Sequence, residues 1–119
     1  MNSITGTYKL VKYGYQYKAD DRFENISDGY DGVIHYSPEG FMSVVLRFEK
    51  QPTDFSEIVA YCGSYKVSGD EIVHQVTMSV RPEYEGQTLV RKFKCDAQNL
   101  ETEFENTDEF RKFAIWKRI

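Results

Sequence analysis

Two polar side chains in this sequence are predicted to face an apolar interior, His74 and Arg91. Each lies in a segment where apolar and polar residues alternate, and each falls on the apolar side. Successive side chains of a strand point to opposite faces, so both are expected to point inward. A buried arginine keeps its charge, and a buried histidine needs partners for its ring nitrogens. The pair suits recognition of an anionic or carbonyl group, or acid–base work with a tyrosine. The alternative is an internal hydrogen-bond network that fixes the strand register.

Large side chains share these predicted inner faces. Tyr36, Tyr61 and Tyr65 bring hydroxyl groups to the interior under the same alternation. We take His74, Tyr65 and Arg91 as candidate catalytic residues. An apolar cup with a few convergent polar groups is typical of a small-molecule pocket, although ordinary filling of the interior is an alternative for each wall residue. The predicted ligand-binding set is Tyr36, Met42, Tyr61, Tyr65, His74, Met78, Arg91 and Phe93.

Other kinds of site have little support. His35 and His74 are predicted on opposite faces, and no carboxylate falls on an assigned inner face, so we expect no metal site. The two cysteines, Cys62 and Cys95, are too few for a disulfide scaffold, and their opposite predicted orientations disfavour a disulfide. Neither a glycine-rich phosphate loop nor a serine nucleophile elbow is present in the sequence. We therefore expect no cofactor.

The composition indicates one globular domain over residues 1–119. Fifteen Lys and Arg against nineteen Asp and Glu give a net charge of −4, which argues against nucleic acid and anionic membranes as partners. No apolar run has the length of a membrane span. The first ten residues lack the basic and apolar regions of a secretory signal, so we expect a cytoplasmic protein. Aromatic residues make up 15% of the chain, which suits a pleated surface or an aromatic-lined cavity.

Eight short β-like runs follow one another along the chain, at residues 5–17, 33–36, 41–48, 58–67, 71–81, 87–95, 100–105 and 110–118. The turns at 37–40 and 82–86 carry Pro and Gly. Residues 18–32 are predicted to form a long loop and residues 52–58 to include one helical turn, and both are candidate lids. Bulges are expected near Gly14 and within 110–116, where the alternation changes. Eight consecutive strands predict an all-β, antiparallel, up-and-down barrel, with a sandwich as the alternative.

Several short strings in this order carry a family resemblance: GTYKLV at 6–11, GVIHYSPEGFMSV at 32–44, AYCGSYKV at 60–67, VHQV at 73–76, the 82–86 turn, VRKF at 90–93 and WKR at 116–118. The chain resembles the small bacterial and fungal lipocalin-like domain family, a branch of the calycin barrels. The resemblance implies a closed barrel with an internal cavity. The family more often has Trp where Tyr8 stands, and this Trp closes the barrel base near a basic residue of the last strand. The resemblance assigns this part to Tyr8 and Arg118. Related barrels bind hydrophobic small molecules, and some catalyse cyclisations or isomerisations.

We expect a small-molecule binding protein that holds a largely hydrophobic ligand, with a polar or anionic end, inside the barrel. One alternative is a cofactor-independent isomerase or cyclase that uses the cavity as its active site. The other is a filled barrel with a structural role, whose strand edges or faces form a homodimer. The volume of the cavity distinguishes the filled barrel from the first two.

Overall fold

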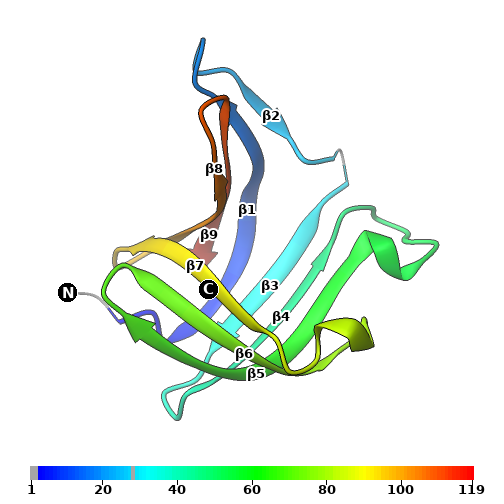
Figure 1. Ribbon diagram of the computed structural model, residues 1–119, viewed down its shortest axis with the longest axis vertical. Coiled ribbons are helices and arrows are strands. Elements are labelled where there is room, and N and C mark those ends of the chain that lie inside the picture. Colours follow the sequence, from blue (N-terminus) through cyan, green and yellow to red (C-terminus); the bar gives the residue numbers. More distant parts are fainter. Residues whose placement is uncertain (1–2, 28) are drawn as a thin grey trace.

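The computed structural model describes residues 3–27 and 29–119, with only the backbone at Phe55, and nine β-strands in this part of the chain form one antiparallel sheet (Figure 1). Two short 3₁₀ turns, η1 (Phe55–Glu57) and η2 (Pro82–Tyr84), interrupt the strands. None of the described residues belongs to a helix that is long and apolar enough to cross a membrane. The strands are β1 (Gly6–Tyr17), β2 (Phe23–Asn25), β3 (Asp31–Tyr36), β4 (Phe41–Arg47), β5 (Ile58–Ser68), β6 (Glu71–Ser79), β7 (Thr88–Cys95), β8 (Asn99–Asn106) and β9 (Phe110–Arg118).

Pairing between the first and last long strands closes the sheet into a barrel. Each strand from β3 to β9 pairs with its neighbour in sequence, and β9 returns to pair with β1. The eight-stranded up-and-down barrel is therefore confirmed. The short strand β2 lies outside it and pairs with the second half of β1, from Gly14 to Gln16. The prediction of an uninterrupted loop at 18–32 is wrong, because β1 extends beyond its pairing with β3 and offers β2 a free edge.

Alternation of apolar and polar residues places the core inside the barrel. In β3 and β4, Ile34, Tyr36, Val44 and Leu46 are buried, whereas intervening residues such as Val45 are exposed. Apolar side chains on one face of a strand gain free energy by leaving water, which fixes the face that turns inward. The largest fully buried side chains are Trp116, Tyr8, Tyr36, Ile72, Leu100 and Val76.

Three bulges adjust this pattern; one lies near Gly14 as expected, and the other two lie outside 110–116. Register shifts occur at Val11 in β1, at Thr77 in β6 and at Phe104 in β8. The change of alternation near Gly14 reflects the extra residue at Val11, whereas β9 itself has no extra residue in its pairing with β1 or β8. An extra residue in a strand reverses the faces of all residues beyond it.

The barrel narrows at one end and opens at the other. At the narrow end, the hydroxyl of the fully buried Tyr8 donates to the carbonyl of Ile4, and the guanidinium of Arg118 lies over the Tyr8 ring. At the other end β7 and β8 separate (Figure 1), because they pair only from Lys92 to Cys95, while the first residues of β7 pair with β6 alone. This separation widens the open end of the barrel.

Candidate functional site

A cavity of about 430 Å³ occupies the open end of the barrel. Its walls combine apolar and aromatic side chains with a small number of polar groups. A neighbouring hollow of about 140 Å³ lies beside it, and the two share the lining residues Val59, Tyr61, Arg81, Tyr84 and Arg91. The apolar and aromatic walls are Tyr13, Ile34, Val44, Leu46, Phe48, Val59, Tyr84, Phe104 and Trp116, and the polar groups are Tyr36, Tyr61, His74, Arg81, Arg91, Thr102, Glu105 and Lys112.

His74 on β6 sits between two tyrosine hydroxyl groups. Its Nε2 atom lies 2.7 Å from the hydroxyl oxygen of Tyr36 on β3, and its Nδ1 atom lies 2.7 Å from that of Tyr61 on β5. Tyr36 and His74 are buried, whereas Tyr61 is partly exposed. Tyr65 packs its ring edge-on against Tyr36, with 4.9 Å between the ring centroids. Both ring nitrogens of His74 therefore have hydrogen-bond partners, and Tyr36, His74 and Tyr61 hold one another in place.

His74, Tyr36 and Tyr61 are all neutral at pH 7, and burial strengthens this preference in each of them. The pKa of His74 falls from 6.5 to about 4, because burial disfavours the charged imidazolium and the positive charge of Arg91 adds to this effect. Burial raises the pKa of Tyr61 to about 12, and it raises the pKa of Tyr36 well above the usual value of 10. Arg91 opposes both of these increases because its charge favours the phenolate form. The site presents neutral hydrogen-bonding groups beside one fixed cation.

Arg91 on β7 is that cation. Its guanidinium lies over the ring of Phe104 on β8, with 5.0 Å between the guanidinium carbon and the ring centroid, so it spans the gap where the two strands separate. It also donates to the carbonyl of Val90, at 3.3 Å. No carboxylate within the described part of the chain forms an ion pair with it. Arg91 therefore brings a positive charge to the cavity wall that no described carboxylate pairs with directly, although Glu105 lines the same cavity.

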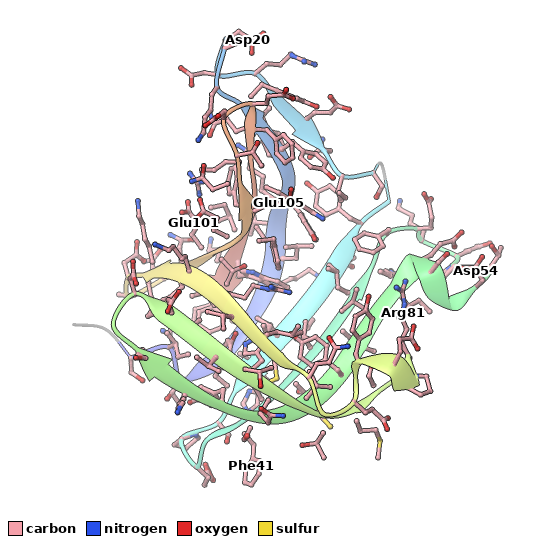
Figure 2. All side chains as sticks on the ribbon, in the orientation of Figure 1. Asp20, Phe41, Asp54, Arg81, Glu101 and Glu105 are labelled. Carbon is pink, nitrogen blue, oxygen red and sulfur yellow. The ribbon has the colours of Figure 1, made fainter. Side chains whose placement is uncertain are left out.

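Further charged groups surround the opening, and sequence reasoning missed them. Lys112 comes from β9. Glu105 comes from β8, and Arg81 precedes the η2 turn; both are labelled in Figure 2. The Lys112 ammonium lies 5.9 Å from the centroid of the Tyr13 ring. In the sequence these residues are ordinary surface charges at strand ends. Only their position at the barrel mouth, where loop-borne residues commonly bind ligands, would have singled them out.

The structure brings four of the eight predicted ligand-binding residues together at the cavity: Tyr36, Tyr61, His74 and Arg91. Three others, Met42, Tyr65 and Phe93, belong to the packed interior and do not line it. The Tyr65 hydroxyl donates to the carbonyl of Ser37 at 2.6 Å. This candidate catalytic residue therefore has its hydroxyl hydrogen-bonded at the narrow end of the barrel, away from the cavity. The prediction that Met42, Tyr65 and Phe93 point inward is confirmed, but side chains fill the part of the barrel interior in which they lie.

The placement of Met78 in the cavity wall is wrong, since its side chain is 65% exposed. Cys62 pairs with Met78 and Gly63 with Val76, so Thr77 is the extra residue of a bulge. Val76 keeps the inward orientation of His74, and every residue after the bulge faces the opposite way from the prediction.

The described side chains of the two candidate lids contribute little here: Ile58 alone among them lines the neighbouring hollow. Residues 52–58 include the expected helical turn, η1, in which the Asp54 carboxylate accepts a hydrogen bond from the backbone N–H of Ser56 at 2.7 Å. No described side chain of 52–58 or 18–32 lines the cavity. The η2 turn contributes Tyr84 instead, because the β6–β7 connection ends beside the cavity.

Metal ligands do not cluster anywhere in the described residues: no three side chains of His, Cys, Asp or Glu gather in a way that could hold an ion. Cys62 is exposed and Cys95 is partly buried, and both are free thiols.

A closed eight-stranded antiparallel barrel with one open, hollow end is the architecture of a lipocalin-like barrel. The sequence profile described as "Lipocalin-like domain" matches residues 48–119, more than half of the chain, and the chain therefore belongs to this family. The crystal structure of a lipocalin-like protein from Bacteroides uniformis is similar over 98% of each chain, with a TM-score of 0.59 and 17% sequence identity. A crystal structure from Bacteroides eggerthii is similar over 98% of this chain and 100% of that chain, with a TM-score of 0.56 and 12% identity. No curated protein matches the chain in sequence. At these identities the two structures show the fold alone.

Proposed function

We propose that this protein binds a largely hydrophobic small molecule inside the barrel, with the polar or anionic end of the molecule beside Arg91 and Tyr61. The observation that carries the proposal is a cavity of about 430 Å³ whose apolar walls surround an arginine without a carboxylate partner in the described residues. Ligand pockets typically measure about 300–1,000 Å³ and combine apolar walls with a few polar groups. The cavity volume argues against the filled barrel.

The charges around the cavity favour an anionic end on the ligand. Three cationic side chains, Arg81, Arg91 and Lys112, line the cavity together with one carboxylate, Glu105. Arg81 also interacts with the Asp54 carboxylate, so Arg91 and Lys112 carry the local positive charge, which stands against a net charge of −4 for the whole chain. Clefts lined by one sign of charge raise the local concentration of oppositely charged ligands.

The test uses 1-anilinonaphthalene-8-sulfonate, a fluorescent probe with an apolar ring body and one sulfonate. The only tryptophan of the chain, Trp116, lines the cavity, so its fluorescence gives a second readout of binding. We expect Arg91→Met to weaken probe binding about tenfold or more, because a lost charge-assisted contact costs about 1.5–3 kcal/mol. Lys94→Met is the matched control, since Lys94 lies on the same strand and is exposed on the outer face. Equal affinities of wild type and Arg91→Met would contradict the assignment.

Native mass spectrometry of gently purified protein complements the probe. A bound mass that disappears on denaturation gives the mass of the natural ligand, and the same spectrum reports whether the chain forms a homodimer.

A cofactor-independent isomerase or cyclase is the second candidate, and the contact between Tyr61 and His74 favours it. The 2.7 Å separation would let a proton pass between a ligand on Tyr61 and the imidazole. Prolonged incubation of the recovered ligand with the protein tests this function. Conversion that is lost in His74→Ala supports an enzyme, and recovery of the unchanged ligand supports binding alone.

A further inference from the structure

The hydrogens in the contact between His74 and its two tyrosines can be arranged in only two ways. A neutral imidazole carries one N–H and one bare nitrogen, so it donates one hydrogen bond and accepts the other. Both tyrosine oxygens lie 2.7 Å from a ring nitrogen. One tyrosine therefore donates to His74, and the other accepts from it. The accepting tyrosine keeps a hydroxyl hydrogen that needs another acceptor.

Burial selects between these two arrangements. The side chain of Tyr36 is fully buried, and its hydroxyl has no other hydrogen-bond partner among the described residues. If Tyr36 accepted from His74, its own hydrogen would be buried without an acceptor, which is costly. Both tyrosines line the cavity, but Tyr36 has no surface accessible to water, whereas Tyr61 is partly exposed, so water or a ligand can accept its hydrogen. The favoured order is donation from Tyr36 to Nε2 of His74, and from Nδ1 to the oxygen of Tyr61.

We propose that Tyr36, His74 and Tyr61 form a directed hydrogen-bond chain whose last hydroxyl hydrogen, on Tyr61, binds the single anionic oxygen of a phenolate- or enolate-type ligand. This inference rests on the proposed function of the cavity and deepens it. Donation from His74 to the Tyr61 oxygen makes the remaining hydroxyl hydrogen a stronger donor, because linked hydrogen bonds polarise one another. Arg91 supplies the compensating charge on the same cavity wall.

The donor geometry at the polar end of the cavity favours a ligand with a single anionic oxygen over a carboxylate. One hydroxyl hydrogen matches one oxygen atom, whereas a carboxylate is best matched by a pair of parallel donors. One nitrogen of the Arg91 guanidinium donates to the Val90 carbonyl and the group lies over the Phe104 ring. In this position Arg91 contributes charge to the wall, while Tyr61 supplies the directed donor. The aromatic walls, which include Phe48, Phe104 and Trp116, suit a planar conjugated body.

Titration of 4-nitrophenol tests the proposal, because its phenolate absorbs visible light and its phenol does not. In the presence of saturating protein we expect the apparent pKa of the bound probe to fall by about one unit, since the phenolate then binds about tenfold more tightly than the phenol. Nitrobenzene, which lacks the hydroxyl, measures binding to the apolar walls alone. Tyr61→Phe should remove most of the shift, leaving only the part that the Arg91 charge supplies, and should retain the affinity for nitrobenzene.

Tyr36→Phe tests whether the effect of Tyr61 on the ligand depends on the directed hydrogen-bond chain or on Tyr61 alone. Without Tyr36, the Tyr61 hydroxyl is free to donate to His74, so the shift should shrink although Tyr36 is not the group that meets the ligand. Tyr30→Phe is the matched control, since its hydroxyl binds Asn25 outside the cavity. Equal shifts in wild type and Tyr36→Phe would overturn the directed chain.

Three further outcomes separate this inference from the proposed function. If nitrobenzene and 4-nitrophenol bind without a shift, the oxyanion site is wrong and the binding function stands. If 4-nitrobenzoate binds more tightly than 4-nitrophenolate, and does so through Arg91 without Tyr61, the site takes carboxylates and the inference is wrong. If neither nitrobenzene nor 4-nitrophenol binds, both proposals are contradicted.

Discussion

The guanidinium of Arg118 lies over the ring of Tyr8, with 4.7 Å between the guanidinium carbon and the ring centroid. The same group donates to the carbonyl oxygens of Ser3 and Ala97, each at 3.1 Å, and to that of Thr5. One side chain of the last strand thus connects the start of the chain, the β7–β8 turn and the first strand. Tyr8 and Arg118 occupy the places that the family resemblance assigned to them, and together they close the narrow end of the barrel.

Arg118→Met should lower the free energy of unfolding by about 2 kcal/mol. Methionine retains the apolar contact with Tyr8 but removes the cation and the donors to several backbone carbonyls. Urea unfolding followed by Trp116 fluorescence measures the change. Lys117→Met, at the adjacent exposed position, should change stability by less than about 0.5 kcal/mol. A similar loss in both variants would show that the contacts of Arg118 do not stabilise the fold.

The stability of the protein should fall as the pH decreases from about 6.5 to about 4. An unperturbed histidine, as in the unfolded chain, has a pKa of 6.5. In the folded protein the pKa of His74 is about 4, chiefly because the side chain is buried. The unfolded chain therefore binds more protons in this window, so acid favours unfolding, and stability is fully present above pH 6.5. The loss below pH 4 amounts to about 3 kcal/mol.

Urea unfolding at several pH values checks this prediction. His74→Gln should flatten the dependence between pH 6.5 and 4, because glutamine does not titrate. His35→Gln is the control variant, since it replaces the other histidine of the chain, which is exposed on the outer face of β3. An unchanged slope in His74→Gln would assign the acid sensitivity to other groups.

The bulge at Thr77 predicts opposite outcomes for two neighbouring residues of β6. Val76→Lys should destabilise the protein by about 3 kcal/mol or more, because Val76 is 2% exposed and the lysine charge would be buried. Met78→Lys should change stability by less than about 0.5 kcal/mol, since Met78 is exposed. Thermal unfolding of both variants provides the comparison. A large loss in Met78→Lys would mean that Met78 faces inward after all.

Gly63→Ala should destabilise the barrel by about 3 kcal/mol, because an added Cβ would lie 1.8 Å from the carbonyl oxygen of Gln75 on β6. To make room for this Cβ, β5 and β6 would have to move apart, which would break their pairing next to the Thr77 bulge. Ser64→Ala, at the next and exposed position, should be nearly neutral. Thermal unfolding measures both, and a neutral Gly63→Ala would show that β5 and β6 can move apart at little cost.

The alternation of the sequence was sufficient to predict the barrel and most inward-facing residues. In β4 and β8 every second side chain is apolar or small, and Val44, Leu46, Leu100 and Thr102 are buried as this pattern requires. Burial of one face of each strand is a local property with a period of two residues, and it can be read without knowledge of the partner strand.

Features that depend on a second strand could not be read in this way. The strand β2 exists because β1 offers a free edge, and the extra residue at Thr77 is defined only by the pairing of β6 with β5. The sequence therefore gave no sign that Met78 faces solvent, because a bulge changes the register without a characteristic residue at this position.

For the candidate site, the sequence by itself determined the residue types and their faces: histidine, arginine and tyrosines turned toward an apolar interior. Tertiary structure alone decided which of them meet. His74 contacts Tyr36 and Tyr61 because β3, β5 and β6 curve around one barrel interior, while Tyr65 turns to the narrow end. Arg91 lies in the cavity wall because β7 and β8 separate beside it. Alternation specifies a direction for each side chain, whereas distances between strands follow from closure of the barrel.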